Sequence, residues 1–200
     1  MAPAGIGDRL EGLHAVAAGV RAGRVTELFV ENQVVERDEY RALVDGAKRI
    51  GAEVRVVADV RSRARTGAPQ GVIASARPVA PVDLETAVAR TDPPVLLVFD
   101  HVEDPRNVGA AARSAVAAGV HAIVVSSRRA APLGATAFKA AAGALEEVAI
   151  VTVSSIPEAL RELRRRDIWI VGLDADAARG LFDLELLAEP VALVIGAEGR

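Results

Sequence analysis

Short, uniformly apolar runs alternate with segments of helical periodicity through the second half of the chain. Five runs have the length of β-strands: VLLVFD at 95–100, HAIVV at 121–125, VAIVTV at 148–153, IWIVGL at 168–173 and VALVIG at 191–196. Strands that are apolar at consecutive positions are buried on both faces, which is typical of parallel sheets. Helices are predicted between them, at 107–118, within 136–147 and at 157–166. This alternation predicts an α/β fold with a parallel sheet and right-handed crossovers.

The first part of the chain has a different order of elements. Helical spacing at 12–23 and 37–50 alternates with strand-length apolar runs at 25–30, 54–57 and 72–76. The segment ARPVAPVD at 76–83 contains two prolines and no periodicity, so it is the best candidate for a linker. We therefore expect a first domain at 1–77, a linker at 78–92 and a second domain at 93–200.

Composition excludes several classes of protein. The chain has no cysteine, which excludes disulfides, thiolate metal sites and a cysteine nucleophile. The three histidines have no metal-ligand spacing, so no metal is expected. No apolar run approaches the roughly 20 residues that span a bilayer, and no leader pattern begins the chain, so we expect a cytoplasmic protein without a membrane partner. The net charge of −3 argues against nonspecific coating of nucleic acid but permits a local basic surface.

The richest polar segment follows the strand at 95–100. In DHVEDPRNVGAAAR, Asn107 is a candidate helix cap, and Gly109 would let the backbone approach a ligand. Arg113, six residues after Asn107, has the geometry to bind a phosphate with two hydrogen bonds. An ordinary capped helix with a surface arginine explains the same spacing.

One further strand end carries candidate ligand-binding residues. The last strand runs into VIGAEGR, where Gly196 would allow a nucleoside to lie against bare backbone and Glu198 supplies one carboxylate. A tight turn explains this motif equally well. The dinucleotide-binding pattern G-x-G-x-x-G after a strand is absent, so nothing supports a nicotinamide cofactor. His101 lies in the loop after 95–100 and is a weaker candidate for contacting a substrate.

A basic loop lies near the end of the first domain. Arg61, Arg63 and Arg65 alternate along the chain and precede TGAPQG, a loop sequence. A flexible basic loop suits contacts to nucleic-acid phosphates. A solvated surface loop is the alternative interpretation.

The segment that begins at Asp100 resembles a known family. DHVEDPRNVGAAARSAVAAGV is similar to motif 1 of the SpoU/TrmH-type RNA 2′-O-ribose methyltransferases, D-x-x-x-D-P-x-N-x-G-A-x-x-R. The resemblance extends through the later strands to LVIGAEGR, which is similar to the start of motif 2, and back to GLHAV and QGVIA. It implies a small ribosomal-protein-like α/β RNA-binding domain joined to an α/β-knot (SPOUT) methyltransferase domain.

The resemblance also implies a function. It implies methyl transfer from S-adenosyl-L-methionine to a ribose 2′-hydroxyl of RNA, with ribosomal RNA as the expected substrate, by a homodimer. Asn107, Arg113 and Glu198 match catalytic positions, and Arg61, Arg63 and Arg65 are the expected RNA-binding residues. The expected cofactor-binding residues are Leu173, Gly196, Ala197 and Gly199.

One departure from the family leaves the function open. The family continues after motif 2 into motif 3, which supplies much of the cofactor pocket and the knot, whereas this sequence stops at Arg200. The C-terminal knot segment is therefore expected to be missing. The chain is either an incomplete methyltransferase or a noncatalytic RNA-binding protein with a truncated methyltransferase scaffold. A generic α/β nucleotide-binding enzyme is the third interpretation, if the motif 1 match is accidental.

Overall fold

A computed structural model describes residues 5–128 and 130–197 of the chain. It divides into two compact units. The first contains Met1–Val79, Pro105–Arg113 and Pro132–Glu146, and the second contains Ala80–Asp104, Ser114–Ala131 and Glu147–Arg200.

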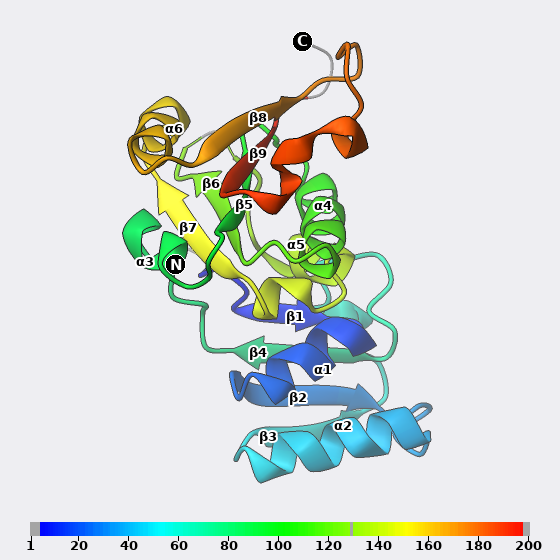
Figure 1. Ribbon diagram of the computed structural model, residues 1–200. Coiled ribbons are helices and arrows are strands. Elements are labelled where there is room, and N and C mark those ends of the chain that lie inside the picture. The colour runs from blue at the N-terminus through cyan, green and yellow to red at the C-terminus, as the bar shows by residue number, and fades with distance from the viewer. Residues whose placement is uncertain (1–4, 129, 198–200) are drawn as a thin grey trace. The chain divides into compact units, whose positions relative to one another are not determined.

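The first unit is built on a four-stranded mixed sheet (Figure 1). Its order is β1-β4-β2-β3, and only β2 and β3 are parallel. The strands are β1 (Arg9–Glu11), β2 (Val25–Glu31), β3 (Glu53–Val57) and β4 (Val72–Ala76). Helices α1 (Leu13–Arg21) and α2 (Asp38–Arg49) pack on one face of this sheet. Helix α5 (Ala135–Ala140) contacts β1 and α1 and completes the unit.

The second unit contains a five-stranded sheet in which every pair is parallel. Its order is β7-β6-β5-β9-β8. The strands are β5 (Val95–Phe99), β6 (Ala122–Ser126), β7 (Ala149–Val153), β8 (Trp169–Leu173) and β9 (Val191–Ile195). The predicted α/β class and parallel sheet are confirmed.

The core of the second unit explains why these strands are apolar throughout. On one face, Leu96 and Val98 of β5 pack with residues of α3 (Leu84–Val88) and α6 (Ile156–Arg165) in a single cluster. On the other face, Leu97 and Phe99 are at most 3% exposed. Burial on both faces removes the polar side of the strand, as the pattern predicted.

Two elements were not predicted. Strand β1 has three residues and pairs antiparallel with β4, a partner more than sixty residues away in sequence. Helix α3 lies in the segment 78–92, which was expected to be a linker. Asp83 caps α3 by accepting a hydrogen bond from the Thr86 N–H at 2.7 Å. Leu84 and Ala87 of α3 are buried in the core of the second unit, so this segment contributes to the fold.

Candidate functional site

Three strands of the parallel sheet end at the same edge. Phe99 of β5 pairs with Ile195 of β9, which pairs with Leu173 of β8. Just beyond these ends, the Asp100 N–H donates to the Ile195 carbonyl at 2.9 Å. The chain crosses from β7 at one edge of the sheet to β8 at the other, and β9 then inserts between β5 and β8. Ligands of open α/β sheets bind beyond the carboxyl ends of the strands, which makes this edge the candidate site.

Helix α4 (Pro105–Ala117) carries Asn107 and Arg113. The prediction that Asn107 caps this helix is wrong, because the helix begins two residues earlier, at Pro105. Proline suits the first helical position, since its fixed φ is already helical and its missing N–H costs nothing there. Asn107 therefore lies in the first turn and is half-buried, whereas Arg113 is exposed. Arg113 is six positions after Asn107, which corresponds to about 9 Å along the helix axis.

Gly109 of α4 has a packing role that the sequence did not reveal. A side chain added at this position would place its Cβ 2.4 Å from the Ala137 carbonyl oxygen and 2.7 Å from the Ala140 Cβ. The sequence suggested that this glycine lets the backbone approach a ligand. The space that a Gly109 side chain would need is instead filled by α5. Gly109 therefore permits α4 and α5 to pack closely within the first unit.

Gly196 differs from Gly109 because its surroundings are open. Among residues 5–128 and 130–197, no heavy atom lies within 4 Å of the position that a Cβ would take at Gly196, and the residue is exposed. Leu173, 37% exposed, supplies an apolar side chain at the register of Ile195. Ala197 is half-buried. Glu198 and Gly199, the other predicted residues of this segment, lie outside the described residues.

The arginines of the basic loop are exposed, but the loop backbone is anchored. Glu11, which is completely buried, accepts hydrogen bonds from the Arg65 N–H at 2.6 Å and the Thr66 N–H at 2.9 Å. Farther along, the Gln70 side chain accepts from the Leu13 N–H at 3.2 Å. The loop therefore presents its arginines from a fixed backbone, although its sequence suggested flexibility.

Two residues that support this loop were not identified from the sequence. Glu11 ends a strand of only three residues, too short to be recognised by periodicity. Phe29 of β2 lies 5.1 Å from the guanidinium carbon of Arg63, within the range of a cation–π contact. Both contacts join residues that are distant in sequence, so no local pattern identifies them.

We expect Glu11→Gln to destabilise the first unit by about 2 kcal/mol, because the glutamine amide would face backbone N–H groups that need an acceptor. Urea unfolding measures this change. Glu27→Gln is the matched control: Glu27 lies on β2 of the same sheet and pairs with Arg55 at the surface, at 3.3 Å. Its loss should cost less than about 1 kcal/mol. Equal costs for the two variants would contradict the anchoring role of Glu11.

His121 has a structural role. Its Nδ1 accepts from the Val95 N–H at 3.2 Å, and its Nε2 lies 3.1 Å from the Ala87 carbonyl oxygen. Burial lowers the pKa of His121, and the hydrogen bond to Ala87 opposes that shift. The neutral ring, with Nε2–H as donor, satisfies both contacts.

Metal and membrane features were also sought in the part of the chain that the structure describes. Within residues 5–128 and 130–197, no three His, Cys, Asp or Glu side chains are grouped to hold a metal ion. Over the same residues, no helix has the length and apolar character needed to cross a bilayer.

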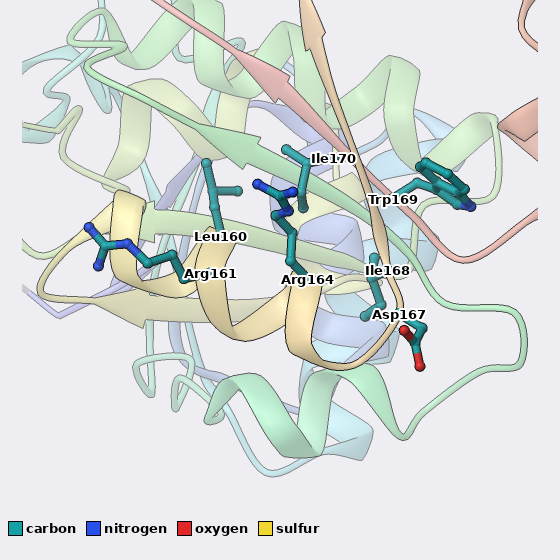
Figure 2. A pocket seen from close by; sticks show the side chains of 7 residues that line it. All are labelled: Leu160, Arg161, Arg164, Asp167, Ile168, Trp169 and Ile170. Atoms are coloured by element: carbon teal, nitrogen blue, oxygen red, sulfur yellow. The ribbon is translucent and has the colours of Figure 1, made fainter.

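One cavity lies away from the candidate edge. It has a volume of about 740 Å³ and lies between α6 and β8 (Figure 2). Figure 2 shows Arg164 beside Leu160 and Ile170, while Trp169 points away from them. Its lining contains an acidic side chain, Asp167, and few polar groups that converge, so we assign no site to it.

Comparison with known proteins identifies relatives over nearly the whole chain. Residues 94–200 match the model of the SpoU rRNA Methylase family. The 23S rRNA (guanosine-2′-O-)-methyltransferase RlmB of Photorhabdus laumondii is 37% identical over 197 residues, which are 94% of this chain and 80% of that protein. RlmB of Escherichia coli K12 is 36% identical over 202 residues, which cover 96% and 82% of the two chains.

A solved structure supports the fold. The SpoU methyltransferase AviRb from Streptomyces viridochromogenes, in complex with the cofactor AdoMet, superposes with a TM-score of 0.76 at 24% sequence identity. The match covers 96% of this chain and 73% of AviRb.

Proposed function

Because the chain belongs to the SpoU rRNA methylase family, we propose that it transfers a methyl group from S-adenosylmethionine to a ribose 2′-hydroxyl of ribosomal RNA. The observation that carries this proposal is the similarity to RlmB proteins, at 36–37% identity over at least 94% of the chain. The edge at which β5, β9 and β8 end supports it, because ligands of open α/β sheets bind beyond the carboxyl ends of strands and this edge lies in the matching region.

The residues at this edge fit an adenosyl group. The open backbone at Gly196 lets a flat ring approach, and the exposed Leu173 side chain offers apolar contact. We therefore assign Leu173, Gly196 and Ala197 to cofactor binding, together with Gly199. S-adenosylmethionine supplies an electrophilic methyl group when it is bound.

The proposed catalytic residues are Asn107, Arg113 and Glu198. A ribose hydroxyl is a weak nucleophile at neutral pH, so transfer requires alignment of the oxygen and removal of its proton. Arginine keeps its own proton, so Arg113 acts by holding the ribose and its phosphate with a planar, charged fork. In this scheme Asn107 orients Arg113, and Glu198 supports the site.

The remaining proposals concern RNA, assembly and location. We assign RNA binding to the domain at 1–77 and methyl transfer to the domain at 93–200, connected by 78–92. The anchored backbone of residues 65–66 supports the first assignment, because contacts on a fixed loop cost less entropy to form. We also propose that the protein acts as a homodimer in the cytoplasm.

Calorimetry with S-adenosylmethionine and transfer of a labelled methyl group to RNA test the proposed function together. Cofactor binding and a 2′-O-methylated product are expected. RNA binding without cofactor binding would favour the noncatalytic alternative. A product methylated on the base would contradict the proposed chemistry.

We expect simultaneous replacement of Arg61, Arg63 and Arg65 by alanine to weaken RNA binding and flatten its salt dependence. Loss of about three phosphate contacts should reduce the slope of log K against log salt by about 2 to 3. Fluorescence anisotropy at several salt concentrations measures both quantities. The control removes the same charge from exposed helical positions, Arg21, Arg41 and Arg49. Equal slopes for the two triple variants would leave the loop as ordinary surface.

A further inference from the structure

A second cavity opens at the carboxyl ends of β5, β6 and β7. Its volume is about 320 Å³, which is in the range of sites for small molecules. It shares β5 with the candidate cofactor edge but extends the other way along the sheet. The lining residues are Asp100, His101, Ser126, Arg128, Ser154, Ser155, Ile156 and Pro157. All belong to the second unit.

Arg128 gives this cavity an available positive charge. Its backbone is fixed, because its N–H donates to the Ser126 hydroxyl oxygen at 3.2 Å. The Arg128 guanidinium makes no hydrogen bond or ion pair with any residue in 5–128 or 130–197. Some other arginines of the second unit have acidic partners, such as Arg161 with Glu158 and Arg166 with Glu162. A guanidinium without a partner in a cavity is suited to a phosphate.

Hydroxyl groups line the opposite wall, between β7 and α6. Ser155 caps α6 by accepting from the Glu158 N–H at 3.4 Å, and its own hydroxyl hydrogen is left to donate. The Ser154 hydroxyl has no hydrogen-bond partner among the described residues. Two hydroxyl donors therefore face the same space as the Arg128 side chain. Hydroxyl and guanidinium donors are the groups that contact nucleic-acid backbones.

His101 is held at the cavity by an unusual backbone conformation. Its φ is +57°, which a non-glycine residue rarely adopts. In this position its Nδ1 lies 2.7 Å from the Asp100 carboxylate oxygen. The Nδ1–H donates to the carboxylate, and the bare Nε2 of this tautomer can accept a hydrogen bond from a ribose hydroxyl. Asp100 also makes the cavity less attractive to a doubly charged free anion than to a singly charged phosphodiester.

We propose that this cavity binds a phosphodiester of the RNA substrate, with Arg128 as its main contact and Ser154 as a further contact, while His101 meets an adjacent ribose hydroxyl. The identification of the ligand as RNA rests on the proposed function. The expected position of the RNA follows from the strand that the two sites share. The β8–β9 side of β5 is assigned to the cofactor, so the β6–β7 side is left for the substrate. The cavity would then add to the affinity for RNA without taking part in the chemistry.

Arg128→Ala tests the proposal, with Arg164→Ala as its control. Both side chains are exposed arginines of the second unit, but Arg164 lines the cavity between α6 and β8. Anisotropy should show about 5- to 10-fold weaker RNA binding for Arg128→Ala and a salt slope smaller by about 1. The affinity for S-adenosylmethionine and the methylation rate at saturating RNA should equal those of the wild type. Ser154→Ala should weaken RNA binding by a smaller factor.

The possible outcomes separate this proposal from the proposed function. If wild-type protein methylates RNA and Arg128→Ala binds RNA with unchanged affinity and slope, the cavity assignment is wrong and the function stands. If RNA binding depends on Arg128 but no methyl group is transferred, the proposed function is wrong and the cavity assignment stands. A third outcome would overturn the proposal. Inorganic phosphate would raise the thermal midpoint of the wild type but not of Arg128→Ala, while the two proteins bound RNA with equal affinity. The cavity would then be a site for a free anion.

Discussion

Replacing Arg113 by alanine is expected to lower the rate of methyl transfer by about 10³-fold, the magnitude found when a positioned electrostatic or proton-transfer group is removed. Arg113→Lys should be nearly as inactive, because an ammonium cannot reproduce the planar fork that holds a ribose and its phosphate together. The affinity for S-adenosylmethionine should stay within about twofold, since the proposed cofactor contacts are on β8 and β9. Single-turnover methylation and calorimetry measure the two effects separately.

The control for Arg113 is Arg165→Ala, which removes an exposed arginine from α6 and should leave both quantities unchanged. Substantial activity in Arg113→Lys would reject the role of the fork. A parallel loss of cofactor affinity in Arg113→Ala would make the residue structural. Either result would require another residue to align the ribose hydroxyl.

Gly109→Val is expected to destabilise the first unit by about 4 kcal/mol, at the upper end of effects for single substitutions. The valine side chain would need space now occupied by α5, where the nearest atom is the Ala137 carbonyl oxygen at 2.4 Å from the added Cβ. A backbone atom cannot rotate away as a flexible side chain can, so the two helices must separate. Urea unfolding monitored by circular dichroism measures the loss.

Ala110→Val is the matched control, because Ala110 is the next residue of α4 and is exposed. It adds two methyl groups to the same helix and should cost less than about 1 kcal/mol, the difference in helix propensity. Similar costs at the two positions would show that helix propensity, and not contact with α5, governs Gly109. The role of this motif 1 glycine in packing would then be wrong.

Most elements of the fold were predicted from local patterns. The five strands of the second sheet were found because their apolar runs are continuous and end at polar or glycine residues. The helices at 13–21 and 38–49 were found from their apolar spacing and the glycines that follow them. The start of α4 was misjudged, because Asn107 is a common capping residue, whereas Pro105 begins the helix.

The candidate site was only partly predictable. Motif 1 and the final glycine segment identified Asn107, Arg113 and Gly196 because their residue types and spacing are distinctive. The partners of these segments lie far away in sequence, so the anchoring of the basic loop by Glu11 and the packing of Gly109 against α5 had no local pattern. Arg128 carried no motif, and its proposed role depends on the serines that line the same cavity and on the absence of an acidic partner for it in the described part of the chain.

The sequence by itself determined the class of fold and the strands that are buried on both faces, because burial requires apolar side chains at consecutive positions. Only the tertiary structure decided the order of those strands. The last strand, β9, inserts between β5 and β8 and thereby aligns Phe99, Ile195 and Leu173 at one edge. Strands of similar apolar sequence can be arranged in many orders with equal burial of their side chains. The order that forms depends on backbone hydrogen bonds and packing between residues that are distant in the chain.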